Sequence, residues 1–109
     1  MSNMGYIIVF DCPDKQSLID KILDEASRAG AGRYKNYSRG AVITRGYGTW
    51  KPEKGAHPSI GKIGSVSKVP SVRIEMTCPD GKVKAVCNAI RKVHPYEEPT
   101  IYAIKVEYR

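Results

Sequence analysis

The sequence predicts an α+β fold, a ferredoxin-like βαβ–βαβ sandwich built from one domain that spans residues 1–109. Two observations carry this prediction. The motif Cys12-Pro13-Asp14 follows one strand-like segment and recurs as Cys78-Pro79-Asp80 after another. Each copy is followed by apolar residues at helical spacing and then by a further strand-like segment. The chain is therefore expected to contain two βαβ units, with a core of about residues 6–106.

The first unit begins with the β-branched and aromatic segment 6–10, which is long enough for a strand but too short for a helix. Pro13 cannot continue a ladder, and we expect Asp14 to cap the helix that follows. An apolar stripe predicts an amphipathic helix over 15–29, which glycines then end. Residues 40–47 read as the second strand.

The second unit begins at 72–76, where apolar and polar residues alternate as in a half-buried strand. The apolar stripe over 83–93 predicts the second helix. His94-Pro95 ends it, because the residue before a proline disfavours the α region. Residues 100–106 form the last predicted strand.

These elements predict an antiparallel sheet with one face covered by two helices. We expect the first and third strands to be central and parallel to each other. Cys12 and Cys78 would then leave the same end of neighbouring strands and lie close together, as shielded thiols rather than a redox pair.

A long loop between strands 2 and 3, residues 48–68, exceeds what a minimal sandwich needs. It contains Trp50, Ile60, Ile63 and Val66, so it is not a simple flexible linker. The small parent core offers these side chains little room. A neighbouring subunit is therefore the expected partner of the loop.

The net charge of +7 is concentrated in one segment, because residues 33–73 contain nine basic residues and one acid. Such a field attracts phosphates, nucleotides, nucleic acid or carboxylates, although solubility alone also explains a basic surface. The longest apolar run, Ile7–Phe10, is too short to cross a membrane. No secretory signal is evident, so the cytoplasm is the expected compartment. Three cysteines do not make a disulfide scaffold.

Five ordered motifs resemble those of a known family. They are Ala29-Gly30-Ala31-Gly32-Arg33-Tyr34-Lys35-Asn36-Tyr37-Ser38, Gly46–Pro52, Gly55–Gly64, Val72-Arg73-Ile74-Glu75 and His94-Pro95-Tyr96-Glu97-Glu98-Pro99. Together they are similar to the YqfO domain, the CutA-like module of the Nif-three-like (Ngg-one-interacting-factor-three-like) proteins. The resemblance covers roughly residues 6 to 104 and is to the stand-alone form of the domain.

The resemblance implies a fold akin to CutA and the PII signalling proteins, and it implies a homotrimer, since those relatives are trimers. The dinuclear metal site of the larger Nif-three-like proteins lies in their other domain and is not carried over. The chain also departs from the family pattern. A cysteine often found near Arg39 or Gly40 is absent, and Ser67–Ser71 replaces an acidic pair before Val-Arg-Ile-Glu.

A possible divalent metal site combines His94, Glu97 and Glu98, with His57 as a further ligand. One imidazole and two carboxylates suit a divalent cation or a polar ligand. The alternative is structural: two prolines make a rigid turn, and His94 lies favourably at the end of a helix dipole. We favour the turn.

A second group of residues predicts binding of a small anionic ligand. Glycines and lysines on the central loop can offer N–H groups and charge to an anion, as PII relatives hold nucleotides at this position. Arg73 and Glu75 share one face of a strand and can pair with each other or with a neighbouring subunit. The candidate ligand-binding residues are Asn36, Tyr37, Gly48, Lys51, Lys54, Lys62, Arg73 and Glu75.

The sequence offers no nucleophile beside a base, so we expect no catalytic residues. The function predicted is a non-enzymatic, trimeric, CutA- or PII-like binding or regulatory module for an anionic metabolite or a divalent metal. One alternative is an accessory subunit of a metal-dependent Nif-three-like hydrolase. Another is association with nucleic acid through the basic segment, where Tyr34 and Tyr37 could stack on bases; we expect them instead to pack the helix-to-strand connection.

Overall fold

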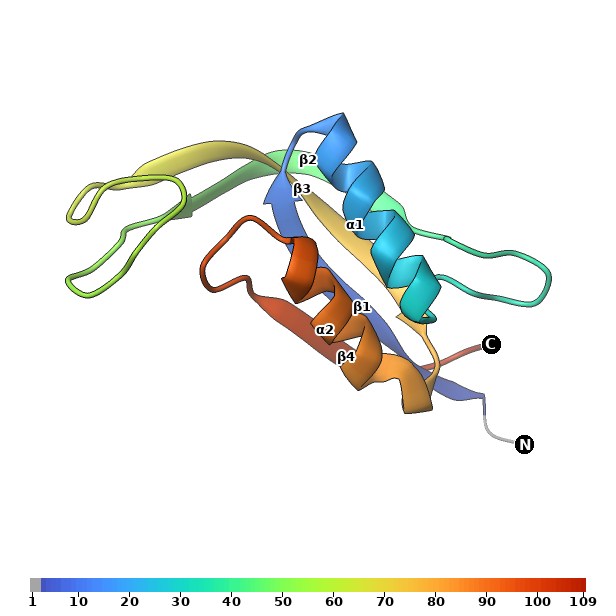
Figure 1. Ribbon diagram of the computed structural model, residues 1–109. Coiled ribbons are helices and arrows are strands. Elements are labelled where there is room, and N and C mark those ends of the chain that lie inside the picture. Colours follow the sequence, from blue (N-terminus) through green and yellow to red (C-terminus); the bar gives the residue numbers. More distant parts are fainter. Residues whose placement is uncertain (1–2) are drawn as a thin grey trace.

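The computed structural model describes residues 3–109 as a four-stranded antiparallel sheet with two helices on one face (Figure 1). The strand order is β2-β3-β1-β4. This arrangement confirms the predicted α+β sandwich. The elements in chain order are β1 (Met4–Pro13), α1 (Gln16–Ala29), β2 (Val42–Trp50), β3 (Ser67–Cys78), the 3₁₀ turn η1 (Asp80–Lys82), α2 (Val83–Val93) and β4 (Ile101–Glu107).

The central strands are antiparallel, so the prediction of parallel strands was wrong. The hairpin from β2 into β3 reverses the chain direction, which makes β3 antiparallel to both of its neighbours. Tyr6 pairs with Cys78 and Cys12 pairs with Val72. The two cysteines therefore lie at opposite ends of the sheet rather than side by side. Burial raises the pKa of each thiol to about 11, as expected for shielded cysteines.

The core lies between the helices and the inner face of the sheet. Alternate residues of β1 and β3 point toward the helices, and Ile8 and Ile74 are fully buried there. They meet Ile22 of α1 and Ile90 of α2, each also fully buried. Asp14 does not cap α1 as expected, because its carboxylate accepts a hydrogen bond from Arg45 Nε at 3.2 Å.

Neither helix covers the opposite face of the sheet (Figure 1). Register places Val42, Tyr102 and Ile104 on that open face, and their exposed fractions are 61%, 59% and 48%. Large apolar groups left exposed on a sheet face commonly mark an interaction surface.

The central loop is shorter than predicted, because β2 and β3 pair as far as Trp50 and Ser67. This two-stranded extension and the loop 51–66 form an arm that projects from the sheet, and the molecule measures 50 × 25 × 22 Å (Figure 1). Its own chain shelters part of the arm: Pro52 is buried, while Ile63 and Val66 stay exposed. The expectation that a neighbour is needed thus applies to the exposed tip only.

Candidate ligand pocket between the arm and the α2–β4 turn

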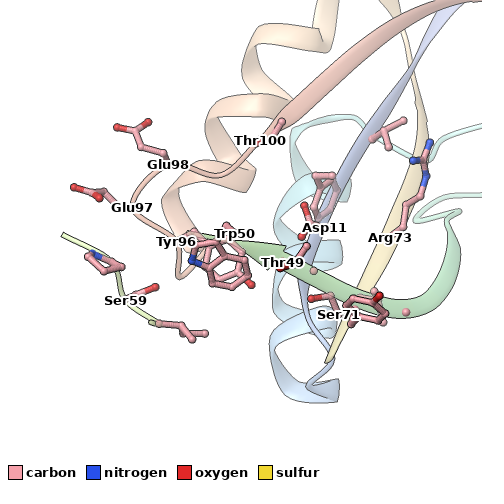
Figure 2. A pocket seen from close by; sticks show the side chains of 18 of the residues that line it. Asp11, Thr49, Trp50, Ser59, Ser71, Arg73, Tyr96, Glu97, Glu98 and Thr100 are labelled. Carbon is pink, nitrogen blue, oxygen red and sulfur yellow. The ribbon is translucent and has the colours of Figure 1, made fainter. Parts of the chain in front are cut away.

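A hollow of ≈ 670 Å³ opens where the base of the arm meets the turn between α2 and β4 (Figure 2). We call it the aromatic pocket. Its walls come from the last part of β1, most of β2, the middle of β3 and the start of β4, and from the arm loop and the turn at 96–100. The residues that decide its chemistry are Asp11, Arg45, Gly48, Trp50, Ser71, Arg73, Tyr96, Glu97 and Glu98.

Two aromatic rings form the central wall. The ring centroids of Trp50 and Tyr96 are 5.2 Å apart, and Figure 2 shows the two side chains together. The packing holds the arm against the turn. It also presents a flat apolar surface to the hollow, of the kind on which planar ligands stack.

The hydroxyl of Tyr96 is buried and has no hydrogen-bond partner among residues 3–109. The nearby Ser71 hydroxyl donates instead to the carbonyl of Val69 at 2.9 Å. Burial raises the pKa of Tyr96, the charge of Asp11 adds to this rise, and interaction with Ser71 opposes it. Tyr96 therefore stays a neutral phenol, with its hydroxyl packed beside Ser71.

Gly48 makes room beside Ser71, Asp11 and Trp50. A Cβ at that position would lie 3.2 Å from Ser71 Oγ, 3.6 Å from an Asp11 carboxylate oxygen and 3.7 Å from the Trp50 ring. Any side chain there would reach into the pocket. The glycine predicted for ligand binding thus contributes space and an accessible backbone.

His94 has a structural role in the turn. Its Nε2 lies 2.7 Å from the carbonyl oxygen of Asp11, and its Nδ1 accepts a hydrogen bond from the Tyr96 N–H at 3.1 Å. These partners require the proton on Nε2 and a neutral ring. Burial lowers the pKa of His94, and the Asp11 carbonyl and charge partly oppose that shift. The geometry matches the rigid turn that the sequence favoured.

The four candidate metal ligands do not converge. Both ring nitrogens of His94 are engaged, and Glu97 accepts a hydrogen bond from the backbone N–H of His57 at 2.9 Å. Glu98 points outward from the turn beside Glu97 (Figure 2). Within residues 3–109 no three His, Cys, Asp or Glu side chains are grouped as metal ligands. Metal binding by these residues stays a prediction.

The predicted anion-binding residues separate into three places. Gly48 and Arg73 line the aromatic pocket. The three lysines, Lys51, Lys54 and Lys62, lie on the exposed arm loop and do not line it.

The other three lie at the opposite end of the sheet. Tyr37 and Glu75 line a separate hollow there, and Asn36 occupies an exposed turn beside it.

Sequence reasoning did not single out Asp11, Trp50, Ser71 or Tyr96 as site residues. Trp50 and Tyr96 belong to motifs that were recognised, but they are far apart in the sequence and no local pattern pairs them. An aromatic residue in each of two separate motifs was the only available signal.

No protein-family model matches the chain. Curated relatives do. The chain is 42% identical over 80 residues to the GTP cyclohydrolase 1 type 2 homolog of Halalkalibacterium halodurans, and the match covers 73% of this chain and 22% of that protein. The homolog from Bacillus subtilis is 47% identical over 70 residues, with 64% and 19% covered. The chain thus spans about a fifth of the length of these relatives.

A solved structure of a longer protein contains a domain with the same fold. The Bacillus cereus protein related to NIF3 superposes with a TM-score of 0.82 at 26% identity, over 99% of this chain and 27% of that one. The chain is a YqfO-type, CutA-like domain of the Nif-three-like family. This chain matches only about a fifth of the length of those relatives, so their activity is not assigned to it.

The fold of this Nif-three-like domain is shared more widely. CutA1 from Shewanella sp. SIB1 superposes with a TM-score of 0.66 at 15% identity, over 94% of this chain and 79% of that one. The GlnK–ATP complex of Bacillus subtilis gives 0.63 at 11%, over 97% and 84%. These likenesses establish the CutA- and PII-like fold. Among residues 3–109, no helix is long and apolar enough to span a membrane.

Proposed function

We propose that this Nif-three-like domain is a non-enzymatic binding module that assembles as a homotrimer and takes a small anionic ligand in the aromatic pocket. The coarser part of this proposal, a small binding or regulatory module, is supported by the CutA- and PII-like fold and by the named relatives. The ligand and the trimer are inferences from the site and the open face.

The observation that carries the proposal is the Tyr96 hydroxyl, buried without a partner in the wall of the hollow. A buried polar group that makes no hydrogen bond costs about 1–3 kcal/mol, so a ligand gains up to that much when a small movement of the ring lets it supply the missing bond. The rings of Trp50 and Tyr96 provide a stacking surface beside the same hydroxyl. A planar ring with a polar edge fits this combination.

Arg73 supports an anionic group on that ligand. Its guanidinium is 3.8 Å from the nearest Glu75 oxygen, which is longer than a charge-assisted hydrogen bond. The other lining arginine, Arg45, is already held by Asp14. Two of the acids that line the pocket face other partners or solvent. Glu97 accepts a hydrogen bond from the His57 N–H, and Glu98 points outward. Arg73 is therefore the lining cation best able to bind a carboxylate or phosphate.

The open face supports self-association. The exposed apolar side chains of β4, Tyr102 and Ile104, lie there, and covering them with another copy would remove them from water. The resemblance to CutA and PII proteins implies three copies. The GlnK relative is an ATP complex by its description, so adenine nucleotides are suitable first probes of the pocket.

Thermal unfolding with ATP, AMP, Zn²⁺ or Mn²⁺ tests the ligand, because a compound that binds only the folded state raises the melting temperature. We expect an adenine nucleotide to raise it in the wild type and Tyr6→Phe, and to do so much less in Tyr96→Phe and Arg73→Met. Tyr6→Phe is the matched control, since Tyr6 does not line the pocket.

A rise with metal alone would replace the anionic ligand by a cation, and metal-stimulated phosphoesterase activity would overturn the non-enzymatic assignment. Native mass spectrometry tests the assembly separately. A monomer at micromolar concentration would remove the trimer from the proposal.

A further inference from the structure

A second surface lies at the end of the sheet opposite the arm (Figure 1). The segment 33–39, which we call the tyrosine hairpin, joins α1 to β2. Tyr34 and Tyr37 form an isolated antiparallel bridge, with both N–H···O distances at 3.0 Å. Both side chains nevertheless face solvent, with Tyr34 45% and Tyr37 78% exposed. The expectation that they pack the connection is therefore not met: Tyr37 is largely exposed, and Tyr34 packs against Tyr108, with ring centroids 6.0 Å apart.

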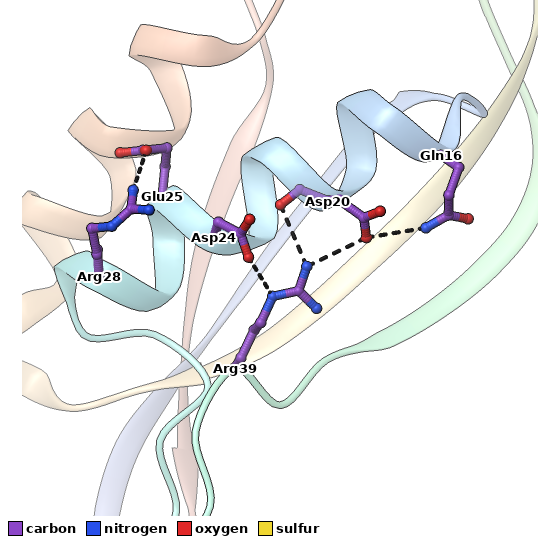
Figure 3. Close-up of polar contacts among 6 residues, drawn as sticks. All are labelled: Gln16, Asp20, Asp24, Glu25, Arg28 and Arg39. Atoms are coloured by element: carbon purple, nitrogen blue, oxygen red, sulfur yellow. Dashed lines mark hydrogen bonds and ion pairs between the residues drawn. The ribbon is translucent and has the colours of Figure 1, made fainter.

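The tyrosine hairpin is held in a fixed position. Arg39 donates from Nε to Asp24 at 2.7 Å and from a terminal nitrogen to Asp20 at 3.3 Å, both on α1 (Figure 3). At the base, the Gly40 N–H donates to the carbonyl of Gly32 at 2.9 Å. A rigid surface loses little conformational freedom when a partner binds, which favours affinity.

The backbone of the tyrosine hairpin is also strained. Lys35 has a φ of 52° and Arg39 a φ of 58°, although neither is a glycine. Such conformations persist only where the surrounding contacts impose them, and they concentrate at functional surfaces. For Arg39 the ion pairs to α1 account for the conformation. For Lys35 the two-residue turn between Tyr34 and Tyr37 accounts for it, because such hairpin turns take a positive φ at their first position.

An apolar hollow of ≈ 250 Å³ lies against the tyrosine hairpin. Its wall includes both tyrosine side chains and Val42, which is 61% exposed. One acid, Glu75, lies in this wall and has Arg73 as its neighbour at 3.8 Å. The hollow is large enough to take one leucine or phenylalanine side chain.

Positive charge surrounds this hollow. Arg33 and Lys35 are exposed, and in the described part of the chain neither has a carboxylate within ion-pair distance. Lys35 lies over the Tyr34 ring, with its nitrogen 5.4 Å from the centroid. Residues 32–41 contain no acid. Tyrosine and arginine side chains beside an apolar hollow are typical of protein-binding hot spots.

We propose that the tyrosine hairpin and its hollow bind a short acidic segment of a partner protein. One large apolar side chain of that segment enters the hollow, and flanking carboxylates pair with Arg33 and Lys35. The complementary charge speeds the encounter, and the apolar anchor supplies most of the binding energy. The hollow shares no lining residue with the aromatic pocket, so binding of the peptide and binding of the small ligand can fail separately.

Selection from a phage-displayed random-peptide library tests this proposal without assuming a sequence. We expect the wild-type domain to enrich peptides with several Asp or Glu residues around one Leu, Ile, Phe or Trp. Synthetic copies of the enriched peptides should bind at least about tenfold more weakly to the double variant Arg33→Glu/Lys35→Glu. They should also bind more weakly to Tyr37→Ser, whose change lies on the surface and leaves the backbone bridge intact.

The matched control is Lys84→Glu/Lys92→Glu, which makes the same charge change on the exposed side of α2. It should bind the peptides as the wild type does. Equal losses in both double variants would show nonspecific attraction and overturn the proposal, as would enrichment of peptides without acids. Binding of a labelled polyuridylate that depends on Arg33 and Lys35, with no acidic peptide selected, would assign the surface to nucleic acid instead.

Discussion

The two βαβ halves of this domain share a core but differ in the connection from helix to strand. In the first half, residues 30–41 leave α1, project as the tyrosine hairpin and are tied back by Arg39. In the second half, residues 94–100 leave α2, turn tightly on His94 and form a wall of the aromatic pocket. Each connection contributes to one candidate site, and the two sites lie at opposite ends of the sheet.

The difference shows how a duplicated unit can acquire two surfaces. The buried elements must keep matching shapes, because each helix packs on the same inner face of one sheet. The connections carry no such constraint, so their length and charge are free to vary. Four predictions test how far the halves are equivalent in the core and separate in their connections.

The largest expected effect tests the equivalence of the two helices. Ile22→Ala in α1 and Ile90→Ala in α2 each remove a fully buried side chain. We expect each to lower the free energy of unfolding by about 2–5 kcal/mol. Urea unfolding at one fixed protein concentration measures this loss. Val66→Ala, at a position 72% exposed, should change it by less than about 0.5 kcal/mol. A loss from only one helix would contradict the shared core.

The next effect concerns the base of the tyrosine hairpin. Gly32 has a φ of +75°, and a Cβ there would lie 2.6 Å from the Gly40 backbone. Gly32→Ala should therefore cost about 1–3 kcal/mol of unfolding free energy. Gly46→Ala is the matched control, because nothing lies within 4 Å of its Cβ position. If both variants unfold at the same urea concentration, the close approach at Gly32 does not exist in solution.

The third effect distinguishes the second connection by pH. Burial lowers the folded-state pKa of His94 below the ordinary 6.5, so the unfolded chain takes up a proton first as the pH falls. Its contribution to stability is complete above about pH 6.5 and is lost as the pH drops toward the folded pKa. The melting temperature should fall over that range.

His94→Gln should cost about 1 kcal/mol at neutral pH and remove most of this decline. His57→Gln is the control, because His57 is exposed and should leave the decline intact. An unchanged pH profile in His94→Gln would show that the ring is not buried and neutral.

The smallest effect concerns the ion pairs of the first connection. Arg39 and its two aspartates are exposed, so Arg39→Met should cost only about 0.2–1 kcal/mol. The cost should shrink in high salt because screening weakens exposed pairs. Arg109→Met, which breaks a single exposed pair with Glu107, should cost no more. A salt-independent loss of several kcal/mol would mean that Arg39 holds the core and not only the tyrosine hairpin.

The sequence by itself determined the kind and order of the elements, the duplication and the family. Apolar periodicity and the Pro and Gly signals act within a few residues, so they can be read locally. They also indicated the turn at His94, because a proline following a helix leaves few conformations.

Only the tertiary structure decided which distant residues meet. Strand direction separated Cys12 from Cys78, and pairing of β2 with β3 as far as Trp50 brought that ring to Tyr96. His94 reaches the carbonyl of Asp11 at the other end of the chain. Such contacts depend on register and packing across the whole sheet, which no local pattern encodes. The buried hydroxyl of Tyr96 and the exposed ring of Tyr37 follow from that packing alone.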